Sequence, residues 1–234
     1  AGYTASVEEH LPETPENVQA NSKAAITDFD LLVIGGGSGG FASAIAASDL
    51  GKRVGMINAG AIGGTCVNVG CVPSKTLIRA AEAWNNAGKH PFKGVITNQS
   101  KLDWATVRTE KDALVAKMRQ NKYVDVLATY PNIYLLEGRA SFQQDGSVRV
   151  NGKTYRANRY VIATGAQPRI PPIPGLIESQ PLTSTTLMDL EALPKSLIVL
   201  GGRAVALELG QTMARFGVKV TILQRSKMLI PEHE

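Results

Sequence analysis

Two cysteines separated by four residues are the side chains in this chain best suited to redox chemistry. Cys66 and Cys71 are the only cysteines, glycines surround them, and Pro73 follows two positions later. Proline suits the first turn of a helix, so we expect Cys71 beside a helix N-terminus, whose partial positive charge favours a thiolate. We expect Cys66 in the glycine-rich loop before it. A short loop of this kind can close a disulfide, which favours a redox centre over two buried, inert thiols.

A glycine-rich turn precedes the cysteines and is expected to position them. Residues 30–34 form an apolar run typical of a buried parallel strand, and a small-residue helix to Leu50 follows the turn. Strand, glycine turn and helix in this order are typical of a dinucleotide-binding unit. We expect Gly35 to permit the tight turn, Gly37 to let backbone approach a pyrophosphate, and Gly40 to let the helix pack on the strand.

The next strand is expected over residues 53–57 and ends at Asn58. An acidic residue commonly holds the ribose hydroxyls at this place in a dinucleotide-binding unit. Asn58 can hydrogen-bond a ribose, more weakly than a carboxylate would, or it is an ordinary turn residue.

A second strand, glycine turn and helix begins at residue 197, and a further strand is expected over residues 218–223. Its turn starts at Gly201 but has Arg203 where the middle glycine is usual. That side chain takes up space that a pyrophosphate would need, although an arginine can also form an ion pair with a phosphate. After the last strand Arg225 is well placed for a 2′-phosphate, which favours NADPH over NADH.

The rest of the chain is expected to supply supporting elements. Residues 80–130 have apolar residues at helical spacing and are interpreted as helices whose aromatic and Met side chains pack in the core. Short strands are expected downstream with turns at Asp145-Gly146 and Asn151-Gly152, and a buried strand enters the Ala163-Thr164-Gly165 motif. The expected strands cover residues 133–136, 139–143, 147–150, 153–156 and 159–165.

Length and charge limit the functional classes. The chain has 234 residues and a net charge of +5 that is dispersed along the sequence, which gives little support for nucleic-acid binding. We expect no membrane span and no signal segment, and therefore a cytoplasmic protein. Residues 1–27 are interpreted as a linker. We expect an FAD-binding domain with the redox disulfide over residues 28–175 and part of an NAD(P)H-binding domain over residues 176–234.

The sequence GGTCVNVGCVPSK, from Gly63 to Lys75, resembles the redox-disulfide signature of the pyridine nucleotide-disulfide oxidoreductases. The resemblance runs from about Phe29 to the end, and it is greatest to the mercuric reductase branch. It implies an α/β fold in which a Rossmann-like FAD-binding domain precedes the truncated start of a second, Rossmann-like NADPH-binding domain. Ala1 to Ala5 is also similar to the last strand of the heavy-metal-associated domain that precedes some members of that branch.

The resemblance also implies roles for individual residues. Cys66 would be the interchange thiol and Cys71 the thiol that contacts the flavin, and both would contact the metal substrate. Lys75 and Glu208 would form an ion pair beside the flavin ring and assist hydride transfer. Further positions are expected to contact the cofactors, namely Gly60, Thr65, Ala140, Thr164, Gly165 and Gly201. His10, His90 and His233 lie outside every motif and receive no role.

The activity implied is reduction of Hg(II) to Hg(0) with NADPH, through FAD and the Cys66–Cys71 pair. A dihydrolipoamide dehydrogenase or glutathione reductase-like enzyme acting on a small disulfide is the alternative within the family. The alternative from a different functional class is a non-catalytic flavin-binding fragment. Family members are about twice as long and dimerise through a C-terminal domain. We therefore expect the full-length protein to be an active homodimer, and this chain alone to be poorly soluble and inactive.

Overall fold

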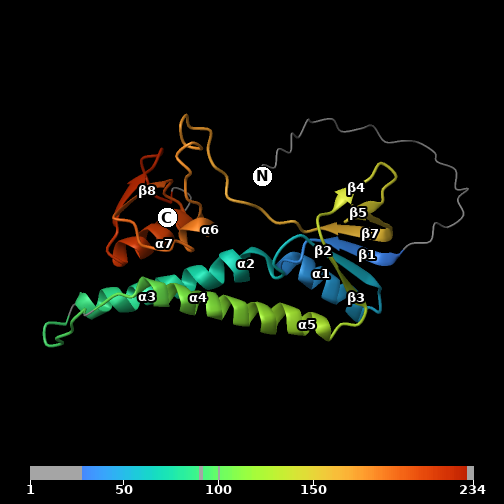
Figure 1. Cartoon of the computed structure of the whole chain (residues 1–234), viewed down its shortest axis with the longest axis horizontal. Helices are drawn as coiled ribbons and strands as arrows, with labels where there is room; N and C mark the ends of the chain where they lie inside the picture. The colour runs from blue at the N-terminus through green and yellow to red at the C-terminus, as the bar shows by residue number, and fades with distance from the viewer. Residues whose placement is uncertain (1–27, 90–91, 100, 231–234) are drawn as a thin grey trace, which may run out of the picture.

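A parallel sheet and a long helical hairpin organise the computed structural model of this chain (Figure 1), which describes residues 28–89, 92–99 and 101–230. The parallel sheet has four strands in the order β3-β2-β1-β7, confirming the α/β expectation. Its strands are β1 (Phe29–Ile34), β2 (Val54–Asn58), β3 (Ile133–Glu137) and β7 (Ala157–Ile162). The proposed linker, the segment similar to a metal-binding domain and all three histidines lie outside the described residues.

Both faces of this sheet are covered. Helix α1 (Ser38–Asp49) packs on one face, where Val33, Phe41 and Met56 belong to one apolar cluster. The other face carries a small antiparallel sheet in the order β4-β5-β6. Its strands are β4 (Ser141–Phe142), β5 (Val148–Val150) and β6 (Lys153–Tyr155). Gly146 and Gly152 have φ angles of 77° and 81°, and both fall in the two predicted turns.

Helices fill the segment between β2 and β3, as the apolar spacing predicts. They are α2 (Gly64–Val69), α3 (Cys71–Gly88), α4 (Trp104–Arg119), the π-helix η1 (Gln120–Val124) and α5 (Asp125–Ala128). The helices α3 and α4 form a hairpin that projects away from the sheet (Figure 1). The π-helical turn was not predicted, because a single inserted residue barely changes the apolar pattern.

The C-terminal part forms a second, smaller α/β unit. It contains α6 (Ser184–Leu187), β8 (Ser196–Leu200), α7 (Ala204–Arg215) and β9 (Lys219–Leu223), with β8 and β9 paired in parallel. Residues 163–183 lead to it through an irregular segment rich in proline. The predicted second strand-turn-helix-strand is therefore present, whereas the one-turn helix α6 was not predicted.

One apolar core joins this second unit to the helical hairpin. Leu77 and Trp104 from the hairpin lie in the same buried cluster as Leu209, Met213 and Phe216 from the second unit. The indole Nε1 of Trp104 donates a hydrogen bond of 2.8 Å to the Leu190 carbonyl. A division of the chain near residue 175 stays a prediction, but the two parts share buried surface.

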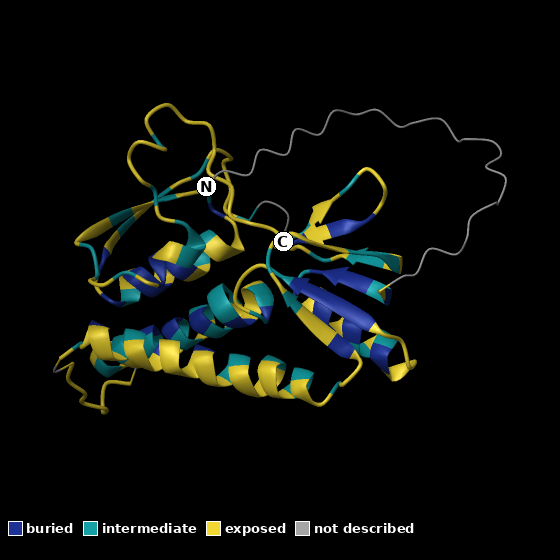
Figure 2. Ribbon diagram, turned by 45° about the vertical axis from the view of Figure 1, so that its right-hand side comes forward, coloured by how far each residue is buried: buried dark blue, intermediate teal, exposed yellow. Residues whose placement is uncertain are grey.

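Burial corrects one expectation about the strands (Figure 2). The strand entering the Ala163-Thr164-Gly165 motif was expected to be buried, yet β7 lies at the sheet edge and Ile162 is 68% exposed. Apolar content alone cannot tell an edge strand from a central one, because it does not say how many neighbours the strand has. In β8, Ile198 is 64% exposed, as expected for a sheet of two strands.

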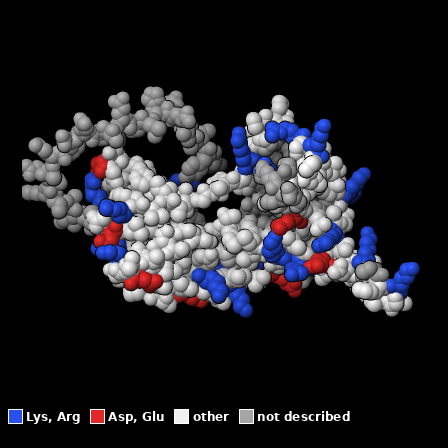
Figure 3. Space-filling view, turned by 180° about the vertical axis from the view of Figure 1, so that it is seen from behind, with Lys and Arg blue, Asp and Glu red and all other residues white. Residues whose placement is uncertain are grey.

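Charged side chains are scattered over the surface (Figure 3), with Lys and Arg most frequent over the second unit in that view. Across residues 28–89, 92–99 and 101–230, none of the helices has both the length and the apolar character required to cross a bilayer.

Candidate active site at the cysteine pair

The first glycine turn has the tight geometry that its sequence predicts. Gly35 has a φ of 120° and its N–H donates to the Ile57 carbonyl at 2.8 Å. A Cβ atom there would lie 2.1 Å from the Ala163 carbonyl oxygen, so this position requires glycine. A Cβ atom at Gly40 would lie 1.8 Å from the Gly35 carbonyl oxygen. Both predicted reasons for these glycines, turn and close packing, are confirmed.

The cysteine segment is docked directly on this glycine turn. Gly63 donates its N–H to the Gly36 carbonyl at 2.8 Å, and Gly37 and Gly63 form a parallel bridge. A Cβ atom at Gly64 would lie 2.6 Å from the Gly37 Cα. Gly63 and Gly64 have φ angles of 100° and 65°. The predicted dinucleotide turn and the predicted redox segment are therefore neighbours in space.

The two cysteines lie on consecutive helices. Cys71 is the first residue of α3, as expected from Pro73. Cys66 is not in a loop, contrary to expectation, because Gly64 already begins the short helix α2. The two helices meet at Gly70, where a Cβ atom would lie 2.8 Å from the Thr65 carbonyl oxygen. Both cysteines are free and exposed, which excludes the interpretation as buried thiols.

Contact between the thiols controls the titration of Cys66. A side-chain hydrogen bond with Cys71 raises the pKa of the Cys66 thiol above its ordinary value, and partial burial and the charge of the neighbouring thiol add to the effect. A hydrogen bond from the Cys71 backbone N–H to the Cys66 sulfur opposes this, with a smaller effect. The backbone N–H at the start of α3 thus donates to the Cys66 sulfur.

The N-terminus of α1 is suited to an anion. Its first turn consists of Ser38, Gly39, Gly40 and Phe41, and in the described structure no side chain caps it. The first N–H groups of a helix have no partner within the helix, and they bind phosphate favourably where the first turn is small. A Cβ atom at Gly39 would meet no atom within 4 Å. These features fit the pyrophosphate of a dinucleotide.

Asn58 is engaged in the turn at the end of β2. Its Oδ1 accepts a hydrogen bond of 3.3 Å from the Gly36 N–H, and its Nδ2 donates to the Gly60 carbonyl. The Asn58 carbonyl accepts from the Gly138 N–H at 2.9 Å. Asn58 therefore has the structural role of a turn residue, and contact with a ribose from Asn58 or Gly60 stays a prediction.

Other predicted cofactor positions meet at the same end of the sheet. The Ala163 N–H donates to the Ile34 carbonyl at 2.8 Å, which places the following Thr164 and Gly165 beside the glycine turn. Gly165 has a φ of 73°. Thr65 is in the first turn of α2, and Ala140 packs against the cluster that contains Phe29 and Val148. Ligands of parallel sheets bind at this carboxyl edge.

The glycine turn of the second unit has the same backbone path. Gly201 has a φ of 108°, and its N–H donates to the Leu223 carbonyl at 2.9 Å. Arg203 is the N-cap of α7 and has extended backbone angles. Gln224 Nε2 donates to Ser226 Oγ at 2.6 Å, whereas the Arg225 side chain is exposed. This arrangement leaves Arg225 accessible to a ligand at the end of β9.

An ion pair joins the two units beside the cysteines, as the sequence resemblance implied. Lys75 Nζ lies 2.5 Å from Glu208 Oε1, with side-chain exposures of 56% and 45%. Lys75 follows Cys71 by four residues and therefore occupies the same face of α3. The pair places a cation and a carboxylate from α7 next to the thiols.

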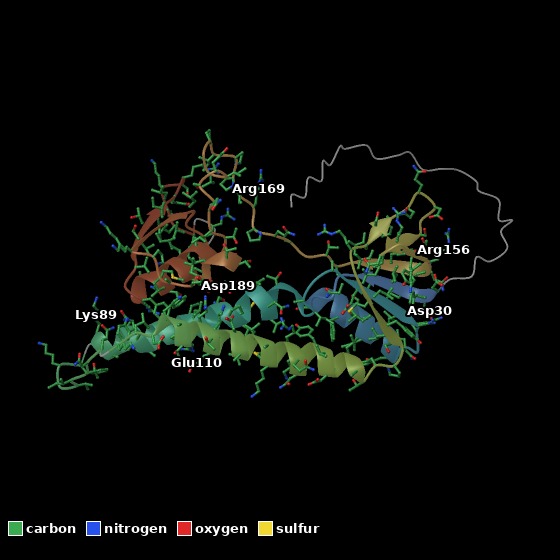
Figure 4. The ribbon with its side chains drawn as sticks, in the orientation of Figure 1. Asp30, Lys89, Glu110, Arg156, Arg169 and Asp189 are labelled. Carbon is green, nitrogen blue, oxygen red and sulfur yellow. The ribbon has the colours of Figure 1, made fainter. Side chains whose placement is uncertain are left out.

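Several residues that shape this region received no role from the sequence. Asn68, between the cysteines, donates to the Ala61 and Ile62 carbonyls of the preceding loop and to the Gly64 carbonyl of its own helix. Lys111 is 2% exposed, and its Nζ lies 2.8 Å from Asp189 Oδ1 and 3.0 Å from the Met188 carbonyl. Figure 4 labels Asp189 where the second unit approaches the hairpin. The burial of this amine is hard to foresee because Met188 and Asp189, which cover it, are nearly 80 residues away in the sequence.

The described residues hold no cluster of three or more His, Cys, Asp or Glu side chains for a metal ion. What they offer a soft metal ion is the pair Cys66 and Cys71. Thiolates are the protein ligands that soft ions prefer.

Residues 29–234 match the family model described as Pyridine nucleotide-disulphide oxidoreductase. The chain belongs to this family. The match begins with β1 and continues through both glycine turns, so the family assignment rests on almost the whole described structure.

The chain is also similar to individual family members. It is 45% identical over 207 residues to a mercuric reductase of Lysinibacillus sphaericus, covering 88% of this chain and 38% of the relative. It is 42% identical over 234 residues to a mercuric reductase of Staphylococcus aureus, covering 100% of this chain and 42% of the relative. The chain thus spans about two fifths of the length of these curated relatives.

Solved structures agree on the fold. The HOCl-induced flavoprotein disulfide reductase RclA from Escherichia coli is 33% identical with a TM-score of 0.73, over 88% of this chain and 44% of that chain. A Cu(II) complex of the same reductase gives 33% identity and a TM-score of 0.75, over 87% of this chain and 44% of that chain. This likeness confirms the predicted Rossmann-like architecture.

Proposed function

We propose that this chain is the flavin- and cysteine-bearing part of an enzyme that reduces Hg(II) to Hg(0) with NADPH. The observation that carries the proposal is the exposed Cys66–Cys71 pair, docked by Gly63 and Gly64 on the first glycine turn. Two adjacent thiols suit a soft ion such as Hg(II), and the adjoining turn suits the cofactor that would deliver electrons. The likeness to mercuric reductases at 38–45% identity supports this substrate.

The cofactor assignments follow the two glycine turns. FAD fits the first turn, where Gly35 and Gly40 make the turn tight and the first N–H groups of α1, which follow Gly37, would face its pyrophosphate. NADPH fits the second turn, where Arg203 and Arg225 would supply cations for its phosphates. Bound FAD would supply a two-electron carrier between nicotinamide and thiols.

Within the chain, each residue near the thiols has a distinct task. Cys66, the interchange thiol by family resemblance, would exchange with or bind the incoming substrate, while Cys71 would face the flavin. Lys75 would stabilise negative charge that develops beside α3, and Glu208 would hold the ammonium group in place from α7. In the overall reaction NADPH loses a hydride, which carries two electrons, and Hg(II) gains two electrons to become Hg(0).

A disulfide-reducing enzyme is the second candidate, favoured by the structural likeness to a flavoprotein disulfide reductase. The same thiol pair can attack a small disulfide, with a mixed disulfide as the intermediate. The greater identity to mercuric reductases favours Hg(II). In either case we expect the longer protein to be a homodimer, as the family resemblance implies.

Turnover by the longer protein that contains this chain tests the proposal. We expect Hg(II)-dependent oxidation of NADPH, followed at 340 nm, to fall at least about 100-fold in Cys66→Ser and Cys71→Ser, because each loses one of the two thiols. Asn86→Ser, exposed near the far end of α3, is the matched control and should retain activity. Turnover with glutathione disulfide or lipoamide but not with Hg(II) would favour the second candidate.

The two thiols should also differ in absorbance. After two-electron reduction, a long-wavelength band between thiolate and flavin should persist in Cys66→Ser and disappear in Cys71→Ser. The reverse result would exchange the two roles.

A further inference from the structure

Asn68 is placed between the two cysteines and ties the cysteine helix to the loop before it. Its Nδ2 donates to the carbonyls of Ala61, Ile62 and Gly64 at 3.3, 2.9 and 2.9 Å. The amide of Asn68, two residues after Cys66, therefore connects α2 to the loop that leads into it. Few side chains other than asparagine offer this donor group at this length together with an acceptor.

The acceptor of Asn68 is used by a residue from a different part of the chain. Arg119, the last residue of α4, donates from Nη1 to Asn68 Oδ1 at 3.1 Å. The two residues are 51 positions apart, and both are half-buried. A hydrogen bond from a charged donor is stronger than one between neutral groups, and partial burial limits competition from water.

The π-helix η1 begins immediately after Arg119 and brings a second side chain to the same loop. Tyr123 stacks edge-on against Phe41 of α1, with ring centroids 4.9 Å apart. A Cβ atom at Gly63 would lie 3.1 Å from the Tyr123 ring. A π-helical turn shifts the side chains that follow it relative to a regular helix, and such turns occur frequently at functional sites.

These contacts converge on a segment that is already fixed on its other side. Gly63 and Gly64 contact the first glycine turn through Gly36 and Gly37. Asn68, Arg119 and Tyr123 thus hold the Ala61–Gly63 loop, and Gly64 at the start of α2, against the proposed phosphate site. The position of Cys66 depends on this loop, because α2 begins at Gly64.

We propose that Asn68 and Arg119 are positioning residues for Cys66, holding α2 so that its thiol stays in contact with Cys71. The inference rests on the proposed function only in treating Cys66 as the exchanging thiol. Loss of either hydrogen-bonding partner frees the loop, separates the two thiols and makes Cys66 more reactive relative to Cys71. Neither residue is expected to touch substrate.

The relative alkylation of the two thiols in the longer protein that contains this chain tests the proposal without any turnover. The reduced protein is treated with iodoacetamide at pH 8, and mass spectrometry of peptides gives the labelling rate of each of the two cysteines. In Arg119→Met and Asn68→Asp, we expect the Cys66-to-Cys71 rate ratio to rise at least about threefold, because release of α2 opens the surroundings of the Cys66 sulfur to the reagent. Arg119→Lys retains a donor and should restore part of the original ratio.

Lys117→Met provides the matched control, since Lys117 is exposed in the same last turn of α4 and carries the same charge. Its ratio should equal that of the unsubstituted protein, and circular dichroism should show each variant folded. An unchanged ratio in folded Arg119→Met and Asn68→Asp would overturn the proposal. Unfolding of Arg119→Met, Asn68→Asp and Arg119→Lys would also overturn the proposal, because Asn68 and Arg119 would then stabilise the whole fold and not the position of Cys66 alone. The alkylation assay contains no Hg(II), so an unchanged ratio would not contradict the proposed function. Equally, absence of Hg(II)-dependent turnover would not contradict a change in the alkylation ratio.

Discussion

The two strand-turn-helix-strand units of this chain follow the same backbone path with different side chains. In β1–α1–β2 and β8–α7–β9, the first glycine has a φ of 120° or 108° and donates to the end of the next strand at 2.8 or 2.9 Å. The N-caps also match: Gly37 has φ −85° and ψ −175°, and Arg203 has φ −92° and ψ 176°. Arginine thus adopts the backbone of the middle glycine without strain.

The units differ in how tightly helix and strand pack. A Cβ atom at Gly40 would lie 1.8 Å from a backbone oxygen, whereas the matching position of the second unit is Ala206, which already has a Cβ. A Cβ atom at Gly35 would lie 2.1 Å from the Ala163 oxygen, whereas one at Gly201 would meet no described atom within 4 Å. Packing therefore dictates the first and third glycines of the first unit. It does not dictate the middle one, Gly37, where a Cβ atom would lie 3.5 Å from its nearest neighbour, and approach of a pyrophosphate there stays a prediction.

The units also differ in what surrounds them. The first lies in a sheet of four strands with both faces covered, while the second has two strands and shares its core with α3 and α4. The second unit thus depends on the helical hairpin for burial, through Trp104 and Lys111 of α4. The same local motif can be self-contained or dependent according to its neighbours.

The largest effect expected from this comparison is on stability at the third glycine. Gly40→Ala should lower the free energy of unfolding by about 3 kcal/mol, because the new methyl group meets rigid backbone. The reciprocal change Ala206→Gly should cost only about 1 kcal/mol, the helix-propensity difference. Urea unfolding followed by circular dichroism measures both. Equal losses in the two variants would show that the packing difference between the units is not real.

An intermediate effect is expected on cofactor choice in the second unit. Arg225→Glu, made in the longer protein, should lower the preference for NADPH over NADH about tenfold or more, because a charged hydrogen bond contributes about 1.5–3 kcal/mol. Lys227→Glu makes the same charge change two residues away and should shift the preference far less. Steady-state kcat/KM for each nucleotide is the measurement. A parent enzyme that already prefers NADH would refute the assignment of Arg225.

The smallest effect on folding is expected at the middle position. Gly37→Ala and Arg203→Ala should each change the free energy of unfolding by less than about 1 kcal/mol, because their extended backbone suits any residue and a Cβ at Gly37 meets its nearest neighbour at 3.5 Å. FAD binding by titration calorimetry should nevertheless weaken about tenfold in Gly37→Ala, because the methyl group hinders approach to the turn. If Gly37→Ala lost as much free energy of unfolding as Gly40→Ala, the proposed distinction between a glycine needed for packing and one needed for ligand access would be wrong.

Much of the site could be predicted because it depends on neighbours in the sequence. Pro73 correctly indicated that Cys71 begins a helix, since proline favours the first turn. The turns at Gly146 and Gly152, and the reasons for Gly35 and Gly40, follow from backbone sterics that act within a few residues. The assignment of Cys66 to a loop was wrong because two glycines usually end a helix, whereas here Gly64 begins one.

The sequence by itself determined the order of the motifs, the two glycine turns, the cysteine pair and, through resemblance, the Lys75–Glu208 ion pair. Only the tertiary structure decided that β7 is an edge strand, that Lys111 is buried against Asp189, and that Arg119 reaches Asn68. It also decided the direction of the Cys66 pKa shift, which comes from contact with Cys71. The physical reason is the range of the forces involved. Backbone sterics and helix propensity act between residues near in sequence, but burial and hydrogen bonding between α4, α2 and the second unit exist only once distant segments have packed together.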